Sequence, residues 1–367
     1  MSSSRIFRAP GRVNLIGEHT DYNLGFVLPV ALNLATEVET KPSSDGALHM
    51  FSEHRGERHS FDLAGLAAAQ PRKHWTDYPV GVARELLALG FELTPLELTI
   101  RSEVPEGAGL SSSAALEVAT ALALLQGREM SPLELARLCQ RAESEFVGLP
   151  CGIMDQYVSV FGRQNSALCI DCRTLEADFV ELPAGVAIVA VNSMVKHQLG
   201  DSAYRTRVAE CTEAAQALGV TSLRDATLEA LGKTLMADKP RHRAWHIVTE
   251  NDRVLRFVAA ARGCDLNEMG ALFVESHASM KADYEITCPE IDFLVETASG
   301  ISACYGARMT GGGFGGCTVN LVDPGSVADF QTSLSAAYQH AFGLVPTFYL
   351  CMPGEGAREI KKSAAGV

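Results

Sequence analysis

The chain lacks an apolar run long enough to cross a membrane. A spanning helix needs about 20 predominantly apolar residues in succession, whereas the longest unbroken run here, residues 186–191, has only the length of a strand. The N-terminal residues 1–5 also lack the apolar segment of a secretory signal peptide. We therefore expect no membrane partner and a cytoplasmic location.

Basic residues are scarce relative to acidic ones. The 367 residues include 31 Lys and Arg against 44 Asp and Glu, a formal net charge of −13. Such a surface repels a phosphate backbone and so disfavours nucleic acid and anionic lipid as partners. One small anionic ligand in a locally electropositive loop is still compatible with this charge.

Regular cysteine spacing is absent as well. The 10 cysteines are scattered between Cys139 and Cys351. In a chain of this length without an export signal, they are expected to be reduced and mostly buried thiols. The single pair Cys169 and Cys172 has no second pair and no nearby histidine, which disfavours zinc binding there.

The chain does contain enough apolar sequence for a large core. Its length and its apolar fraction of 47% suggest two domains, or one domain with a subsidiary lobe. No internal repeat or long linker divides it, but the composition shifts weakly around residues 192–201. We predict an N-terminal lobe over residues 1–195 and a C-terminal lobe over residues 196–367.

Strand and helix patterns alternate along the chain. Residues 96–100 alternate as a strand does, and residues 114–125 are rich in Ala and Leu, which favours a buried helix. Ser131, Pro132 and Glu134 form a capping-box pattern that starts a helix ending near Phe146. Further strands are expected at residues 166–171, 186–191 and 317–322, and further helices at residues 204–218 and 241–262. This alternation predicts an α+β (mixed α/β) protein.

A glycine- and serine-rich loop lies between a predicted strand and a predicted helix. Its members are Gly107, Ala108, Gly109, Leu110, Ser111, Ser112 and Ser113. Backbone N–H groups and the positive end of a helix can hold phosphate oxygens in such a loop, and a serine hydroxyl can reach a magnesium ion. The alternative is a tight turn with a serine N-cap.

A second glycine run, residues 311–316, formally matches the dinucleotide-binding pattern G-x-G-x-x-G. That pattern must follow a strand and open a helix. Here the glycines precede a predicted strand, so the dinucleotide interpretation fails. A conformationally permissive loop beside a ligand and a plain hairpin turn both remain open.

Acidic residues provide the candidate catalytic groups. Asp155 follows Pro150 and Gly152 in an apolar setting, which makes it a candidate base or metal ligand, and Glu143 lies at the end of the capped helix. The polar loop of residues 17–25 combines carboxylate, imidazole and hydroxyl groups that suit a polyol, although it also fits a solvated surface loop. Arg12, just upstream, can contact a phosphate or a carboxylate.

Three blocks in this chain resemble the galactokinase family of the GHMP small-molecule kinases. Residues 11–29 are similar to the family's sugar-binding block, residues 107–115 to its ATP loop, and residues 309–317 to its C-terminal glycine motif. The resemblance implies a two-lobed fold with the active site in the cleft between the lobes. The N-terminal lobe would be ribosomal-S5-like with a mixed sheet, and the C-terminal lobe a ferredoxin-like α+β unit.

The resemblance also implies an activity, transfer of the γ-phosphoryl group of ATP to the C1 hydroxyl of α-D-galactose with Mg²⁺. Asp155 would accept the hydroxyl proton, with Arg12 beside it to keep it ionised and to stabilise charge. Ser113 and Glu143 would hold Mg²⁺. The residues implied to contact the sugar are Glu18, His19, Thr20, Asp21, Gly152 and Tyr204, those implied to contact ATP are the loop 107–113 and Trp75, and the chain is expected to act as a monomer.

The chain departs from the family around Tyr204 and Trp75. Residues 204–208 read Tyr-Arg-Thr-Arg-Val, where the family usually has Tyr-Asn-x-Arg-Arg, and the Trp75 segment differs at Thr76, Asp77 and Pro79. Two alternatives follow, a GHMP kinase for N-acetylgalactosamine or arabinose and a non-catalytic sensor of galactose and ATP. Thr20 and Asn23 favour galactose, and the intact pair Ser113 and Ala114 disfavours a sensor.

Overall fold

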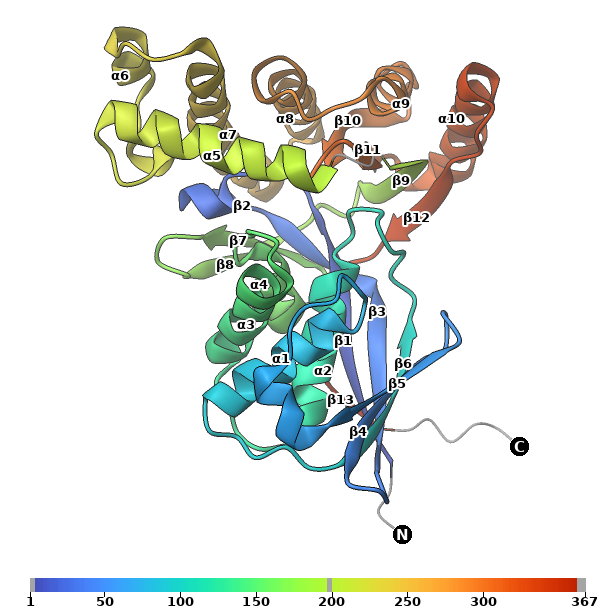
Figure 1. The fold of residues 1–367 in the computed structure, drawn as a ribbon. Helices are drawn as coiled ribbons and strands as arrows, with labels where there is room; N and C mark the ends of the chain where they lie inside the picture. The colour runs from blue at the N-terminus through green and yellow to red at the C-terminus, as the bar shows by residue number, and fades with distance from the viewer. Residues whose placement is uncertain (1–3, 197–199, 362–367) are drawn as a thin grey trace.

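A six-stranded mixed sheet forms the centre of the N-terminal lobe. The computed structural model describes residues 4–196 and 200–361 and orders this sheet β13-β1-β3-β6-β4-β5 (Figure 1). Its strands are β1 (Arg5–Asn14), β3 (Pro29–Pro42), β4 (Ala47–Ser52), β5 (Glu57–Asp62), β6 (Leu96–Ser102) and β13 (Arg358–Ile360). The pairs are antiparallel except β4 with β6, which are parallel. The mixed sheet that the resemblance implied is therefore confirmed.

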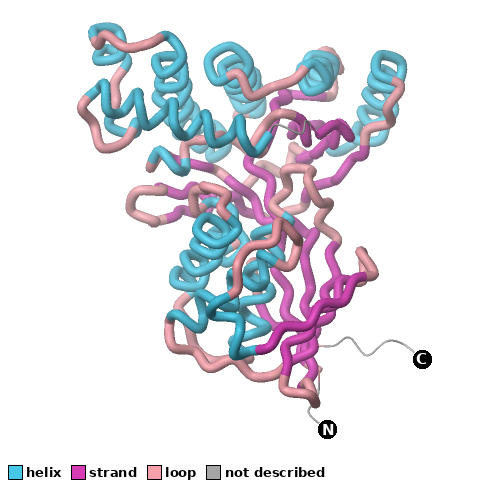
Figure 2. The backbone as a smooth tube through the Cα atoms, viewed as in Figure 1, coloured by secondary structure: helices cyan, strands magenta, loops and turns pink. Residues whose placement is uncertain are grey.

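Four helices pack on one side of this sheet, as Figure 2 shows. They are α1 (Asp77–Ala88), α2 (Ser112–Leu125), α3 (Pro132–Arg141) and α4 (Met154–Phe161). The Ala- and Leu-rich sequence of α2 is buried on nearly every side, and α3 begins with the predicted capping box between Ser131 and Glu134. The first turns of α2 and α4 both point at the junction of the lobes, which places their N-terminal residues close together.

A small antiparallel sheet pairs the end of the first motif block, residues 11–29, with two later strands. It contains β2 (Phe26–Val27), β7 (Ser166–Asp171) and β8 (Ala177–Glu181).

The C-terminal lobe is built on a four-stranded antiparallel sheet in the order β10-β11-β9-β12. Its strands are β9 (Ala187–Lys196), β10 (Cys304–Thr310), β11 (Gly315–Val322) and β12 (Thr347–Cys351). Its helices are α5 (Gly200–Leu218), α6 (Leu228–Lys233), α7 (Asp238–Arg262), α8 (Leu266–Ser279), α9 (Pro289–Ser299) and α10 (Val327–Phe342).

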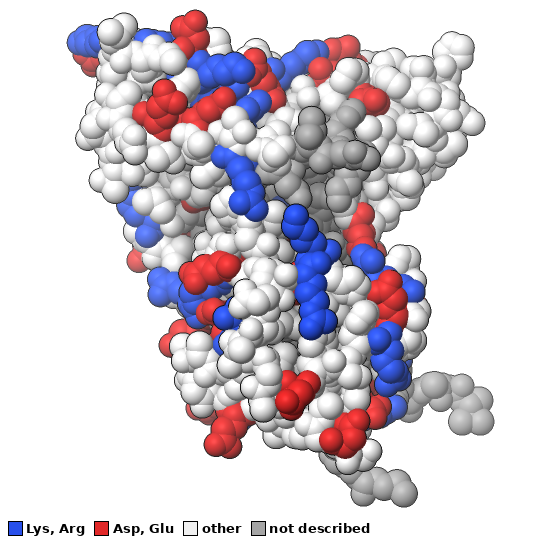
Figure 3. Space-filling view, in the orientation of Figure 1, with Lys and Arg blue, Asp and Glu red and all other residues white. Residues whose placement is uncertain are grey.

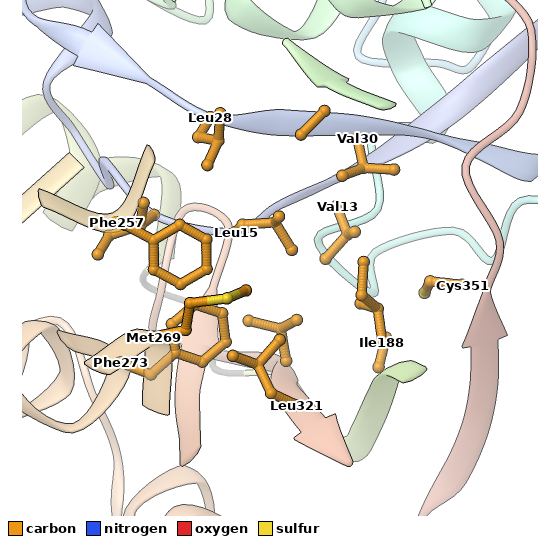
Figure 4. Close-up of a cluster of buried hydrophobic side chains, with 14 of the residues drawn as sticks. Val13, Leu15, Leu28, Val30, Ile188, Phe257, Met269, Phe273, Leu321 and Cys351 are labelled. Atoms are coloured by element: carbon orange, nitrogen blue, oxygen red, sulfur yellow. The ribbon is translucent and has the colours of Figure 1, made fainter. Parts of the chain in front are cut away.

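The two lobes share one apolar core behind their junction. Leu15 and Leu28 from the N-terminal lobe contact the same cluster as Phe257, Phe273 and Leu321 from the C-terminal lobe (Figure 4). Each of these side chains is at most 1% exposed. Because the core is continuous, it holds β1 and the loop after it at a constant position relative to β10 and β11.

The pairing of β9 bears on the division between the lobes. Lys196 closes β9, which pairs with β11 and β12, so the strand lies in the sheet of the C-terminal lobe. A boundary at 195/196 would leave that strand with the wrong lobe, and we propose instead that the chain crosses before Ala187. It crosses back near its end, where β13 pairs with β1. The apolar run at residues 186–191 identified β9 as a strand but contained no information on its partners.

All ten cysteines lie in the described part of the chain as free thiols, and only Cys264 is exposed. Among the described residues no helix is both long and apolar enough to cross a membrane. On the face drawn in Figure 3, acidic and basic side chains are interspersed, with basic side chains gathered near the junction of the lobes.

Candidate active site

A cavity of about 530 Å³ lies where the two lobes meet. The end of β1, the loop before α2, the start of α4 and the loop between β10 and β11 contribute its walls. The predicted site residues that line it are Arg12, Glu18, His19, Asp21, Gly107, Gly109, Ser111, Ser112, Ser113, Glu143, Gly152, Asp155 and Tyr204. Residues from most of the length of the chain therefore converge on one space.

Asp155 lies in the first turn of α4 and is held by two side chains. Arg12 donates to both of its carboxylate oxygens, from Nε at 2.8 Å and from Nη2 at 2.7 Å. Ser111 Oγ donates a further hydrogen bond to Oδ2 of Asp155. Arg12 is itself buried, and such a bidentate charged pair has a well-defined orientation. The carboxylate is therefore fixed and faces the cavity.

Ser111 has a backbone conformation that is unusual for its type. Its φ of 58° is in the left-handed region, and its side chain does not cap α2. A non-glycine residue pays for such a conformation, and strain of this kind concentrates at functional sites. Here the conformation turns the hydroxyl toward Asp155, and the N–H groups that open α2 remain available to an anion.

The two glycine loops meet at this point. A Cβ at Gly311, where φ is +91°, would lie 3.1 Å from the carbonyl oxygen of Gly109. A side chain at Gly311 would crowd this contact, and its φ is one that residues with a Cβ rarely adopt, so both features favour glycine there. The loop at 311–316 belongs to the C-terminal lobe, lines the cavity and lies against the loop at 107–113. It is therefore more than a hairpin turn between two strands.

Glu143 lies in a π-helical turn, Ala142–Val147, that follows α3. Its carboxylate accepts a hydrogen bond from Gln156 Nε2 at 2.6 Å, and Gln156 also donates to the buried Glu117 at 2.9 Å. Burial raises the pKa of Glu143, and the nearby Asp155 raises it further, while a hydrogen bond from Ser113 opposes both effects. This is a buried acidic cluster of oxygen ligands, which suits a hard cation such as Mg²⁺.

The loop after β1 provides a second polar wall. Glu18 Oε1 accepts the N–H of Gly311 at 2.9 Å and lies 3.3 Å from the fully buried Arg308. Burial lowers the pKa of His19 to about 3, with His246 contributing, so the imidazole is neutral near pH 7. Its ring lies 5.0 Å from that of Tyr204 between centroids.

Asp21 and Gly152 are in close contact in this wall. A Cβ on Gly152 would lie 2.0 Å from Oδ2 of Asp21. Burial raises the pKa of Asp21 to about 7, and the charge of Asp155 adds to the shift. A neutral ligand with hydroxyl groups can donate to this carboxylate without adding another negative charge.

Four predicted site residues do not line the cavity. Ala108 and Leu110 are buried in the shared core, and Thr20 Oγ1 donates inward to the carbonyls of Gly17 and Phe26. Trp75 packs in the core of the N-terminal lobe and donates its indole N–H to Glu57 at 2.7 Å. The side chains of these residues point into the protein, and a direct ligand contact for them stays a prediction.

Several residues of the site were not identified from the sequence. Tyr78, Leu149, Cys151, Met154 and Phe314 line the cavity, and His246 holds the loop by contacting the carbonyl oxygen of Glu18 at 3.1 Å. Only Phe314 lies in one of the three motif blocks, residues 309–317, and that block was singled out for its glycines. His246 lies inside helix α7, where one histidine gives no signal of a ligand site.

The sequence of the chain matches models of the GHMP kinases and a known galactokinase. Residues 77–163 match the GHMP kinases N terminal domain, residues 2–42 the galactokinase galactose-binding signature, and residues 257–340 the GHMP kinases C terminal model. The chain is 44% identical over 369 aligned positions to a galactokinase of Roseiflexus sp. (strain RS-1), covering 98% of this chain and 94% of that protein.

Solved structures agree with these matches. A crystal structure of Lactococcus lactis galactokinase complexed with galactose superposes with a TM-score of 0.93 at 34% identity, covering 98% of this chain and 96% of that one. A mevalonate kinase structure has a TM-score of 0.66 at 18% identity, covering 95% and 98%, which shows a shared fold.

Proposed function

The chain belongs to the galactokinase family of the GHMP kinases, and on this basis we propose how its own residues phosphorylate galactose with ATP. The product is galactose 1-phosphate, formed at the C1 hydroxyl of α-D-galactose. The observation that carries the proposal is the fixed carboxylate of Asp155, held by Arg12 and Ser111 where the sugar-side loop and both glycine loops meet.

In the proposed reaction, the C1 oxygen forms a bond to the γ-phosphorus of ATP while the bond from that phosphorus to the bridging oxygen of ADP breaks. The proton of the C1 hydroxyl passes to Asp155. Arg12 keeps this carboxylate in position and carries positive charge next to the transferring group. Phosphoryl transfer depends mainly on such positioning and charge stabilisation.

The residues that would hold Mg²⁺ are Ser113 and Glu143. They fit this ion because burial and the nearby charge of Asp155 raise the pKa values of Glu143 and Glu117, and a bound cation would offset this concentration of negative charge. When bound, Mg²⁺ supplies positive charge to the phosphate oxygens. Gln156 bridges Glu143 and Glu117 and so orients the proposed ligand.

The proposed sugar site consists of Glu18, His19, Asp21, Gly152 and Tyr204. Carboxylates accept hydrogen bonds from sugar hydroxyls, and a neutral imidazole offers one donor and one acceptor. We propose that the chain acts as a monomer, with the cavity lined by residues of one chain. The ten free thiols support a reducing, cytoplasmic location.

Replacement of Gly152 by Ala is expected to raise the KM for galactose about tenfold or more while changing the KM for ATP much less. The new Cβ would displace the carboxylate of Asp21, which is 2.0 Å from its position. Steady-state kinetics with each substrate varied in turn measures both constants. Gly65→Ala is the matched control, because nothing lies within 4 Å of a Cβ there. An unchanged KM for galactose in Gly152→Ala would remove this contact from the sugar site.

Galactose binding is expected to weaken as the pH falls below about 7. Asp21 has a pKa raised to about 7 in the free protein, and only its ionised form accepts from two hydroxyl groups. Protons therefore compete with the sugar, and the dissociation constant should rise up to about tenfold per pH unit on the acidic side. Isothermal titration of galactose from about pH 8 to about pH 5 tests this. Asp21→Asn should bind weakly with a flat profile, and a flat profile in the native chain would contradict the assignment.

The direct test of the function is release of ADP from Mg-ATP across a panel of galactose, N-acetylgalactosamine, glucose, arabinose and no sugar. Stimulation by galactose above the others is expected. Greater stimulation by N-acetylgalactosamine or arabinose would favour a kinase for another sugar, and saturable galactose binding without ADP release would indicate a sensor.

A further inference from the structure

A second group of polar side chains lies outside the cavity, on the edge strand of the N-terminal sheet. Glu57 and His59 are two residues apart on β5, so both point to the same face of the strand. His74 comes from the loop before α1 and faces them, with its ring centroid 4.7 Å from that of His59. We propose that Glu57, His59 and His74 bind a divalent transition-metal ion, Zn²⁺ being the one that suits these ligands best.

The distances between the three side chains are close to those of a metal site. Oε2 of Glu57 lies 3.6 Å from Nε2 of His59 and 3.2 Å from Nε2 of His74. One ligand atom of each residue lies within 4.8 Å of the other two. Ligands about 2.0–2.1 Å from a tetrahedral Zn²⁺ are themselves separated by about 3.3–3.5 Å. Small side-chain rotations are therefore enough to bring all three atoms onto one ion.

The chemistry of the set favours a borderline metal over the magnesium of the active site. Two imidazoles and one carboxylate are a ligand combination that Zn²⁺ uses when it keeps one position open for water. Mg²⁺ prefers an all-oxygen environment. The side chains of Glu57, His59 and His74 are 42%, 34% and 34% exposed, so an ion can enter and a water molecule can complete the coordination.

Neighbouring groups orient two of the three ligands. Trp75 donates its indole N–H to the same Oε2 of Glu57 at 2.7 Å. The hydroxyl of Thr76 lies 2.9 Å from Nδ1 of His74, and the backbone N–H of Thr76 lies 3.4 Å from the same nitrogen, so Thr76 holds the ring with Nε2 toward Glu57. Partners of this kind on the second nitrogen and on the carboxylate are typical of metal sites.

The loop that carries His74 is also held in place. Asp77 accepts the backbone N–H groups of Arg72 at 2.8 Å and of His74 at 3.2 Å. A half-exposed pair of one histidine and one carboxylate is common and contributes little to the stability of a protein. Here, in contrast, two ring nitrogens and an indole N–H converge on one carboxylate oxygen from two separate segments of the chain.

The test uses Trp75 as a reporter at the site. The only other tryptophan, Trp245, is 43% exposed and is replaced first, in a Trp245→Phe background. Titration of this protein with Zn²⁺ should give a saturable change in Trp75 fluorescence that EDTA reverses. Equilibrium dialysis should show one bound ion that is lost in His59→Ala and in His74→Ala, each of which weakens Zn²⁺ binding at least about tenfold.

The matched control is His49→Ala. His49 lies on the neighbouring strand β4 and pairs with a carboxylate, Asp45, but is outside the group of three. It should bind Zn²⁺ as tightly as the Trp245→Phe background, and thermal unfolding without metal checks that each variant is folded. The proposal is overturned if the background protein shows no saturable response. It is also overturned if both His59→Ala and His74→Ala retain the affinity of the control, since binding would then lie elsewhere, for instance at the exposed Cys264.

Discussion

Asp155→Asn is expected to lower the turnover number for galactose phosphorylation by about 10²–10⁴-fold, while galactose binding remains measurable. The amide keeps the shape of the side chain and one acceptor oxygen for Arg12 or Ser111, but it cannot take the proton of the C1 hydroxyl. Coupled-enzyme assay of ADP release gives the turnover number, and isothermal titration gives the affinity for galactose.

Asp178→Asn is a suitable control for this substitution because the Asp178 side chain is 79% exposed. Its kinetics should match those of the native chain. Two results would contradict the role of Asp155. The first is a turnover number that Asp155→Asn leaves unchanged, and the second is a loss of galactose affinity large enough to account for the whole loss of activity.

Arg308→Leu is expected to reduce the free energy of unfolding by about 3–5 kcal/mol, because it leaves the carboxylate of Glu18 buried without its cation. Both side chains are at most 2% exposed, and Arg308 also donates to the carbonyl oxygen of Leu15. Burial already raises the pKa of Glu18, and Arg308 is the largest influence that lowers it. Urea denaturation followed by circular dichroism measures the loss.

A double-mutant cycle separates the contribution of the Glu18–Arg308 ion pair to the free energy of unfolding from the effect of lost packing. Glu18→Gln combined with Arg308→Leu should be more stable than the sum of the two single changes predicts, because neither variant group then carries an unpaired charge. Arg256→Leu, at an exposed ion pair with Glu268, should cost about 1 kcal/mol or less. Strict additivity in the cycle, or a cost for Arg308→Leu no larger than for Arg256→Leu, would contradict this account.

Local sequence patterns predicted the secondary structure well. The capping box at Ser131, the Ala- and Leu-rich helix α2 and strands β6, β7 and β11 are all confirmed. These features depend on residues a few positions apart, through backbone propensity, caps and burial of one face. The same local patterns could not show that β9 joins the C-terminal sheet, since strand pairing is a contact between distant segments.

The same contrast between local sequence and distant contacts holds for the residues of the candidate site. The three motif blocks, with Arg12 in the first, could be named from the chain. Asp155 was named for its apolar setting and Glu143 for its place at the end of the capped helix. The contact of Ser111 with Asp155 and the bridge of Gln156 between Glu143 and Glu117 could not. Spacing along the chain does not determine which side chain faces which across a cavity.

By itself, therefore, the sequence determined the family, the elements and the residue types available for phosphoryl transfer to a sugar. Only the tertiary structure decided which of those residues line the cavity and which, like Thr20 and Trp75, instead make hydrogen bonds within the protein. It also brought Glu57 and His59 next to His74, from segments joined by no motif. The physical reason is that side-chain chemistry is local, whereas burial, charge pairing and ligand geometry arise only when distant segments pack together.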